Sequence, residues 1–229
     1  MSILWMIVLF ILMLYFITWL FTKSKTLSSY SEASEAKTFT SDKLSDPASM
    51  NYSYSVWIYV TSWQTGVKKN VFRRKLEDGT TFSPDVYLDS QDNQLKVGIQ
   101  YSSTNASGTS SGTNVTSVTN IPIQTWTNLI VSLNSRVLDV YVNGKLMKTS
   151  IIPGDPISYK TGDVQLTPSQ SFTGYTSRFI YSANPMGPED AWNTYKSGPS
   201  GNVLLTFLNQ YKIKLSFLKG SEDVASITI

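Results

Sequence analysis

The chain has 229 residues, of which only 15% are charged, and its formal net charge is +3. It contains neither cysteine nor histidine, which excludes a disulfide framework, a zinc thiolate site, a thiol nucleophile and a serine–histidine triad. The small positive charge argues against nucleic acid as a partner, because binders of nucleic acid usually cluster Lys and Arg on one surface. The most basic stretch, 68–75, is interrupted by Val71 and Phe72 and indicates a solvated strand or loop edge.

The first 22 residues form an apolar segment, and 3–22 carry no charge. Twenty helical residues rising about 1.5 Å each span about 30 Å, the hydrocarbon thickness of a bilayer. We therefore expect a transmembrane anchor over 1–22, with these lipid-facing or interfacial residues: Ile3, Trp5, Leu9, Phe16, Trp19 and Phe21. A cleaved signal peptide is the alternative, but no basic region precedes the segment and no small-residue cleavage site follows it.

The orientation of this single-pass protein rests on two opposing signals. Lys23 and Lys25 follow the segment, and the positive-inside rule then predicts a cytoplasm-facing C-terminal domain. Three N-x-Ser/Thr triplets, at Asn51, Asn105 and Asn114, would suit a lumenal or extracellular domain. Such triplets arise readily by chance in a chain rich in Ser and Thr, so we favour the cytoplasmic orientation and keep the other open.

Residues 23–50 are rich in Ser, Thr, Ala, Glu and Lys and show no apolar periodicity. We interpret them as a polar stalk that holds the following domain away from the lipid.

From residue 51 onward the hydrophobic pattern has a period of two, which is typical of strands. Both faces of 52–60 are largely apolar, so this strand is predicted to be central, and 85–90, 94–101 and 126–133 give further strands. Residues 102–117 are a low-complexity polar stretch, which we expect to be an exposed, mobile loop.

The clearest local signal is Asn143-Gly144 between the apolar runs 137–142 and 145–148. An Asn-Gly pair in this setting predicts a type I′ hairpin, because both turn residues need positive φ. Beyond a Pro- and Gly-punctuated loop, two strands are expected at 164–166 and 176–182. A short helix then begins at Pro188, with acids in its first turn, and ends before Gly198-Pro199.

The last residues, 200–229, form an extension. A helix is predicted over 203–211 and two strands over 213–218 and 224–229. We expect the extension to pack on the preceding domain, and the alternative is a docking surface or a strand added to a neighbour.

Several of these segments, taken in order, resemble a known family, the laminin-G-like branch of the concanavalin A-like lectin/glucanase sandwiches. The resemblance lies in these residues: Tyr54-Ser55-Val56-Trp57-Ile58-Tyr59-Val60, Pro122, Trp126 with 128–132, 138–145, Phe172-Thr173-Gly174-Tyr175 before 178–181, and Pro188-Glu189-Asp190-Ala191-Trp192 with Tyr195 and Gly198-Pro199. It implies an all-β, antiparallel jelly-roll sandwich over 51–199, with one or two short helices. The single transmembrane helix expected from the apolar segment precedes this domain. The ending Tyr-Lys-x-Gly-Pro is similar to domains of this type encoded by large algal DNA viruses.

The spacing of the acidic residues argues against catalysis. The glucanase branch uses a close run of acids on one strand face, whereas Glu77-Asp78, Glu189-Asp190 and Glu222-Asp223 are isolated adjacent pairs, and adjacent strand residues point to opposite faces. We therefore predict a protein that is not an enzyme and has no cofactor. Weak candidates for a calcium site are Asp85, Asp89 and Asp92, although Asp is also an ordinary turn residue.

Glycan binding usually needs an exposed aromatic ring. Trp126 and Trp192 fall at core positions of the family that the chain resembles, so packing is the stronger interpretation for both. Trp63, beyond the first strand, is the only one kept open as a candidate glycan contact.

These observations favour a non-enzymatic, membrane-anchored structural protein. If the viral resemblance holds, it is a minor capsid or internal-membrane component of a virion, with the lipid bilayer and capsid proteins as partners. The alternative is a surface-displayed, glycan-binding lectin used for attachment.

Overall fold

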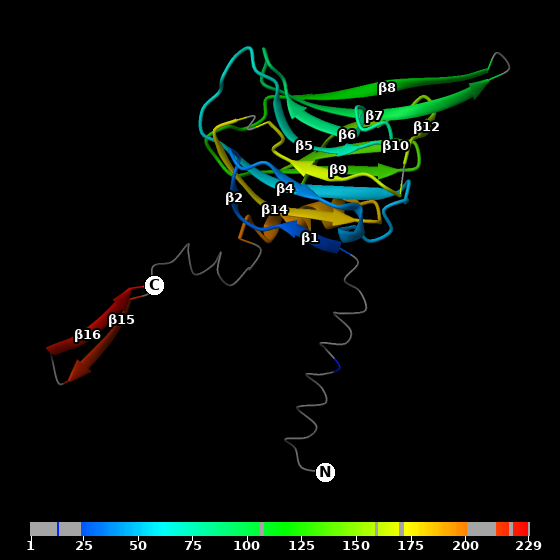
Figure 1. Ribbon diagram of the computed structural model, residues 1–229. Coiled ribbons are helices and arrows are strands. Elements are labelled where there is room, and N and C mark those ends of the chain that lie inside the picture. The colour runs from blue at the N-terminus through cyan, green and yellow to red at the C-terminus, as the bar shows by residue number, and fades with distance from the viewer. Residues whose placement is uncertain are drawn as a thin grey trace, which may run out of the picture.

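Two antiparallel β-sheets lie face to face in the computed structural model of the chain (Figure 1). The structure describes residues 13, 24–105, 108–158, 160–169, 172–200, 214–219 and 222–228. The all-β antiparallel sandwich is therefore confirmed, and one α-helix accompanies it within these ranges.

The first sheet has the order β1-β14-β4-β9-β10-β11, with β2 paired to β14. Its strands are β1 (Ser24–Ser28), β2 (Ser31–Glu32), β4 (Tyr52–Val60), β9 (Thr127–Asn134), β10 (Val137–Val142), β11 (Lys145–Ile151) and β14 (Gly174–Ser182).

The second sheet has the order β12-β7-β6-β5-β13-β3, with β8 paired to β7. Its strands are β3 (Lys37–Phe39), β5 (Lys69–Lys75), β6 (Phe82–Leu88), β7 (Gln94–Asn105), β8 (Gly108–Thr119), β12 (Asp155–Pro156) and β13 (Val164–Leu166). A 3₁₀ turn, η1 (Ser41–Lys43), follows β3, and the helix α2 (Pro188–Lys196) follows β14.

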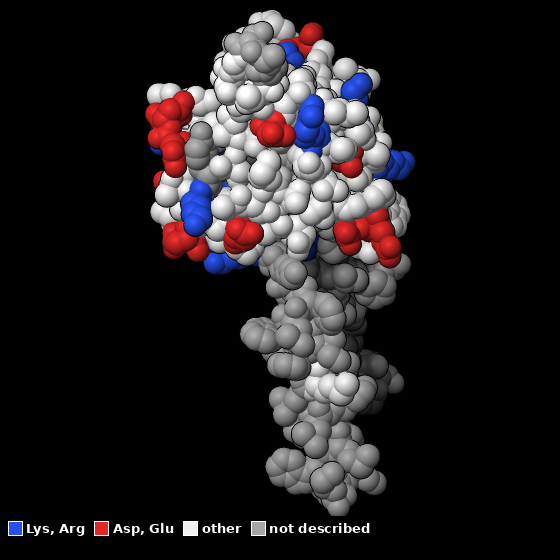
Figure 2. Space-filling model, turned by 90° about the vertical axis from the view of Figure 1, so that its right-hand side faces the viewer, with Lys and Arg blue, Asp and Glu red and all other residues white. Residues whose placement is uncertain are grey.

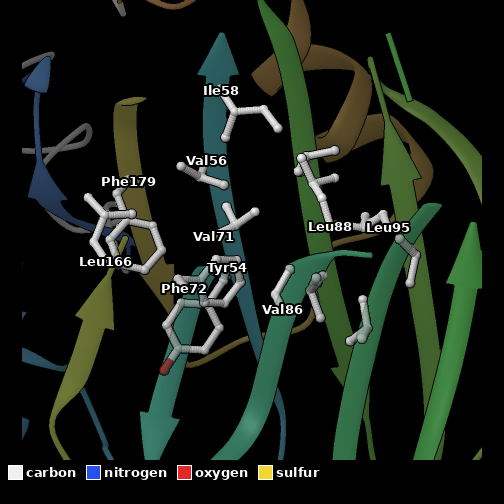
Figure 3. Packing of buried hydrophobic residues seen from close by; sticks show 14 of the residues in the cluster. Tyr54, Val56, Ile58, Val71, Phe72, Val86, Leu88, Leu95, Leu166 and Phe179 are labelled. Carbon is white, nitrogen blue, oxygen red and sulfur yellow. The ribbon is translucent and has the colours of Figure 1, made fainter. Parts of the chain in front are cut away.

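The core fills the space between the two sheets. Tyr54, Val56 and Ile58 alternate along β4 and are fully buried, and in Figure 3 they face apolar side chains of the second sheet such as Phe72 and Val86. The residues between them on β4, including Trp57, point to the other side of the first sheet, as the period of two requires. The predicted central strand is confirmed.

The local signals of the sequence are also confirmed. Asn143 and Gly144 have φ of 51° and 72° and connect β10 to β11, so both turn residues adopt the positive φ that a type I′ turn needs. Helix α2 begins at Pro188, and its buried Ala191 packs against Ile130 and Tyr141 on the outer side of the first sheet.

The segment expected to be a stalk instead contributes to both sheets. Strand β1 pairs with β14, and β3 pairs with β13. Ala33, Phe39 and Leu44 are buried in the core. Three apolar residues spaced five and six positions apart produce no visible periodicity, and main-chain hydrogen bonds hold the segment to the sheets. Residues 24–50 are therefore part of the sandwich, and the expectation of a stalk was wrong.

The polar stretch expected to be a loop is a long β-hairpin. Strands β7 and β8 pair continuously from Gln94↔Thr119 to Asn105↔Gly108, and the hairpin reaches beyond the rest of the sandwich in Figure 1. Most side chains near its tip are exposed, so no apolar alternation marks the strands. The expectation of a loop over 102–117 was wrong for this reason.

The basic stretch is less solvated than expected. Lys69 and Arg74 on β5 are 1% and 4% exposed. The Lys69 ammonium donates to the carbonyl of Val67 at 2.9 Å, and the Arg74 guanidinium donates to the carbonyls of Pro47 and Gly162 at 2.8 and 3.2 Å. Backbone carbonyls thus replace water around both cations.

Two expectations fall largely outside the described residues. The predicted anchor, 1–22, is described only at Met13, and the predicted helix 203–211 is not described at all. In the ranges that the structure does describe, none of the helices has the length and apolar character to cross a bilayer. The two C-terminal strands, β15 (Lys214–Lys219) and β16 (Glu222–Thr228), pair with each other in a separate two-stranded sheet.

Candidate ligand-binding site

Helix α2 covers one part of the outer face of the first sheet. Trp57 and Tyr59 lie two residues apart on β4 and therefore point to this same face. The Trp57 ring stacks on Tyr195 of α2, with centroids 5.7 Å apart and planes 18° apart, and Trp57 is only 3% exposed. Within the part of the chain that the structure describes, no helix covers the neighbouring part of the face, around Tyr59.

Tyr59 is one of four aromatic rings that contact one another here, and we call Tyr30, Tyr59, Trp126 and Tyr175 the aromatic cluster. Tyr30 and Tyr175 stack with centroids 5.4 Å and planes 24° apart. Trp126 makes edge contacts with Tyr59 at 5.7 Å and with Tyr30 at 6.3 Å. The rings come from β4, β14, the segment between β1 and β2, and the residue before β9, so the fold alone brings them together.

Tyr30 is the most accessible ring of the aromatic cluster, with 58% of its surface exposed. Because Tyr175 covers one face of the ring, the accessible area lies on the remaining face and edges. Partial desolvation raises the pKa of the Tyr30 phenol, and the nearby Tyr175 and Glu32 add to this. The hydroxyl therefore stays protonated at neutral pH and is available as a hydrogen-bond donor.

A pocket of about 380 Å³ adjoins the aromatic cluster and shares Tyr175 with it. Its lining combines a carboxylate, hydroxyls and an amide with two apolar side chains, from Glu32, Ser34, Thr61, Gln64, Val67, Phe172, Thr173, Gly174 and Tyr175. The Ser34 hydroxyl donates to a Glu32 carboxylate oxygen at 3.2 Å. Polar groups thus converge beside exposed aromatic surface, which is the usual composition of a small-ligand site.

Backbone contacts at Gly174 build this pocket. A Cβ at Gly174 would overlap the carbonyl oxygen of Tyr59, and the φ of Gly174 is +152°. The amide of Ala33 donates to the Gly174 carbonyl at 2.9 Å, and the amide of Thr61 donates to the Thr173 carbonyl at the same distance. Glycine therefore allows the chain between β2 and β3, the end of β4 and the start of β14 to meet.

Trp63 lies in the loop that follows β4 but is not among the residues that line the pocket. It is partly buried against the main core, and the Lys69 ammonium sits 4.1 Å from its ring centroid. Its role as a glycan contact stays a prediction. Of the two tryptophans expected to pack in the core, Trp126 is in the aromatic cluster and Trp192 is 43% exposed on α2.

The calcium candidates already have protein partners. Asp85 pairs with Lys68 at 2.8 Å, and Asp89 pairs with Lys96 at 3.1 Å. Asp92 accepts from Gln94. Among the side chains that the structure describes, no three acids, histidines or cysteines come together as a metal-binding group. Calcium binding by these residues therefore stays a prediction without a geometric basis.

A second, smaller pocket of about 280 Å³ lies on the second sheet. Asp85, Tyr87, Gly98, Gln100 and Thr113 are among the residues that line it. The Lys68 ammonium lies 3.7 Å from the Tyr87 ring centroid and also holds Asp85, so both groups are engaged within the protein.

Two of the carboxylate pairs serve local structure. Hydrogen bonds from the Thr81 hydroxyl and amide, and from the Thr80 amide, lower the pKa of Asp78 to about 2, so this acid stabilises a turn as a carboxylate. Asp190 accepts a hydrogen bond from the Gly187 amide at the start of α2. Figure 2 shows acidic and basic side chains interspersed over one face of the domain, without a continuous basic surface.

The sequence interpretation missed Tyr30, Glu32 and Tyr175 as site residues. Tyr30 and Glu32 fell in the presumed stalk, and Tyr175 appeared only as part of a family motif. One signal was present, since Tyr30 is the only aromatic residue between Phe21 and Phe39. An isolated ring in a polar segment has to pack somewhere or remain exposed for binding.

Comparison with known proteins identifies the class. The family model described as "Concanavalin A-like lectin/glucanases superfamily", of the laminin G type, matches residues 31–180. The chain therefore belongs to this family, and the match begins inside the segment that we had interpreted as a stalk. No curated protein sequence matches the chain.

Solved structures with a similar fold include binding domains of botulinum neurotoxins. The botulinum neurotoxin serotype D ligand binding domain in complex with N-acetylneuraminic acid gives a TM-score of 0.54 at 11% identity, over 76% of this chain and 43% of that one. The serotype D binding domain gives 0.52 at 11% identity, over 76% and 42%. The chain thus spans less than half the length of these structures, and at this identity the likeness shows the fold alone.

Proposed function

We propose that the domain is a non-enzymatic carbohydrate-binding module. Its ligand rests on the exposed surface of Tyr30 and Tyr175 and places its hydroxyl groups in the adjoining pocket. The observation that carries this proposal is the stacked pair itself, which keeps an accessible aromatic ring next to convergent polar groups.

The chemistry of a sugar matches both parts of the site. A pyranose ring has an apolar C–H face, which packs on an aromatic ring, and a rim of hydroxyl groups, which need hydrogen-bond partners when they leave water. The hydroxyls of Ser34, Thr61 and Thr173 can donate and accept, the Gln64 amide can do both, and Glu32 can accept. The pocket volume lies at the small end of the range for ligand sites, which suits one or two sugar rings.

The family and the fold support the class of ligand. The family description names lectins, and one protein of similar fold was solved with N-acetylneuraminic acid. Glycoside hydrolysis, the other activity in the family description, is less well supported. Retaining or inverting hydrolysis needs two carboxylates, and Glu32 is the only one among the described residues that line the pocket.

A glycan array probed with the full chain in mild detergent tests the proposal. We expect binding to a restricted set of glycans, and at least tenfold weaker binding by Tyr30→Ala and Tyr175→Ala. Trp192→Ala is the matched control, because it removes an exposed aromatic ring on α2, away from the pocket. An array without specific binding, or an equal loss in Trp192→Ala, would contradict the proposal.

As the alternative to a surface-displayed lectin, we propose that the domain is tethered to a bilayer by its N-terminal segment, as a minor capsid or internal-membrane component that faces the cytoplasm. The supporting observation is the run of uncharged residues 3–22. Strand β1 begins at Ser24 and pairs with β14, so a span ending at Thr22 would leave almost no slack before the sandwich. The tether would therefore be short, rather than a long stalk.

Membrane fractionation tests this second proposal independently of glycans. We expect the full chain to stay with the membrane after alkaline carbonate extraction, and a version that begins at Lys23 to be released. Isolation of intact particles would then show whether the protein accompanies capsid proteins in fixed proportion. Release of the full chain by carbonate would rule out the anchor.

A further inference from the structure

The charge of the pocket limits the sugars that it can bind. Among the described residues that line it, Glu32 is the only charged one. The chain segments that line the pocket, 30–35, 60–67 and 172–175, contain the acids Glu32 and Glu35 and neither lysine nor arginine. The lining that the structure describes therefore carries a negative local charge, although the whole chain is positive.

The two lysines that directly follow the pocket segment 60–67 are committed to other contacts. Lys68 follows Val67 of the pocket, but its ammonium lies 2.8 Å from the Asp85 carboxylate and over the Tyr87 ring. Lys69 is 1% exposed, and its ammonium donates to the Val67 carbonyl and faces the Trp63 ring. Neither cation is available to pair with an acidic ligand in the pocket.

Recognition of an acidic sugar requires cationic or amide donors, and the described lining of this pocket contains neither lysine nor arginine. Carboxylate and sulfate groups are held by charge-assisted hydrogen bonds from Arg, Lys or clustered amides, and a like charge nearby weakens binding, because the repulsion grows as the ligand excludes water. The Glu32 carboxylate has the opposite preference. One of its oxygens accepts from Ser34 at 3.2 Å, and a carboxylate can accept about four hydrogen bonds in all, so capacity remains for ligand hydroxyls.

Resting on the proposed function, we infer that the ligand is an uncharged sugar, and that Glu32 both accepts its hydroxyl groups and excludes acidic sugars. The site would then differ in specificity from that of the similar toxin domain solved with N-acetylneuraminic acid. The shared fold does not fix the ligand, because the charge of the site depends on individual side chains.

A matched pair of glycans tests the inference: a galactose-terminated glycan and the same glycan capped with N-acetylneuraminic acid. We expect the full chain to bind the uncapped glycan at least tenfold more tightly at low salt. Glu32→Gln keeps the shape of the side chain and removes its charge. It should weaken binding of the uncapped glycan and reduce the ratio of its affinity to that of the capped glycan. Glu35→Gln removes an exposed charge three residues away, outside the pocket lining, and should leave both affinities within twofold.

The outcomes separate the inference from the proposed function. Equal or tighter binding of the capped glycan would overturn the inference and leave carbohydrate binding standing. If Glu32→Gln leaves the ratio of the two affinities unchanged, Glu32 does not exclude acidic sugars. If the chain binds neither these glycans nor any others, the proposed function is wrong, and the inference that rests on it is wrong as well.

Discussion

The outer face of the first sheet has two halves that share strands and differ in what covers them. In the covered half, α2 lies over Trp57, Ile130 and Tyr141, and Trp57 is 3% exposed. In the open half, Tyr59 points the same way from the same strand but is only partly buried among the other rings of the aromatic cluster. The open half consists of Tyr30, Tyr59, Trp126 and Tyr175.

The difference shows that an outward-facing aromatic residue has no fixed role on a strand. Under a helix the ring contributes buried apolar area and stabilises the fold. Without a helix the same kind of ring is an accessible surface that a ligand can cover. The function therefore depends on where α2 ends as much as on which residues β4 carries.

The largest expected effect comes from Gly174, where the open half is joined to the sandwich. A side chain there overlaps the Tyr59 carbonyl and meets an unfavourable φ of +152°. We expect Gly174→Ala to lower the free energy of unfolding by about 4 kcal/mol, as strained backbone substitutions can. Gly98→Ala on β7 is the control, because its Cβ would meet Thr113 at an ordinary 3.5 Å.

Urea denaturation of both glycine variants provides the measurement, and we expect Gly98→Ala to stay within about 1 kcal/mol of the wild type. If Gly174→Ala were equally mild, close backbone approach would not be what builds the open half.

The covered half gives the next largest effect. Trp57→Ala removes a buried ring and its stacking on Tyr195, and we expect a loss of about 3 kcal/mol in the free energy of unfolding. Trp192→Ala, on the same helix but 43% exposed, should cost about 1 kcal/mol or less. Similar losses in urea denaturation for the two variants would show that burial of Trp57 beneath α2 does not set the cost of removing its ring.

Local signals explain which parts of the fold were predictable. The Asn143-Gly144 turn, the Pro188 start of α2 and the alternation along β4 each depend on residues within a few positions. Residues 24–50 and the β7–β8 hairpin tip are held mainly by main-chain pairing, and every residue type offers the same main-chain groups. Their polar side chains therefore indicated a stalk and a loop.

The candidate site was less predictable than the fold, because its rings are distant in sequence. Tyr59 lies in a predicted strand and Trp126 at the end of another, so both were recognised as aromatic strand residues. The sequence around them does not indicate that α2 packs elsewhere on the sheet. Tyr30 reaches them only because β1 and β2 pair with β14. A long-range contact of this kind follows from the complete topology and has no signature in a short window of sequence.

Trp126 tests whether the rings of the open half support one another. Trp126→Ala removes edge contacts with Tyr59 and Tyr30, and we expect about 1 kcal/mol of lost stability. Glycan affinity should fall as well, since Tyr30 loses one of its two ring neighbours. Calorimetric titration with the best glycan on the array measures this, and unchanged affinity would mean that Tyr175 alone positions Tyr30.

The smallest effect is a difference in pH dependence between the halves. Burial beside α2, with Asp139 nearby, raises the pKa of Tyr141 to about 12, whereas an unfolded tyrosine titrates near 10. Between these values the folded state holds a proton that the unfolded state has lost, so the free energy of unfolding falls as the pH rises from about 10 to 12.

Tyr141→Phe has no phenol proton, so this part of the alkaline loss should disappear when urea midpoints are compared at pH 9 and pH 11. Tyr30→Phe is the counterpart in the open half. The pKa of Tyr30 is raised in the same direction by partial desolvation, but its ring is 58% exposed, so we expect a smaller change in the alkaline slope. An equal change in the two variants would mean that water reaches Tyr141 as freely as Tyr30, and that α2 does not seal the covered half.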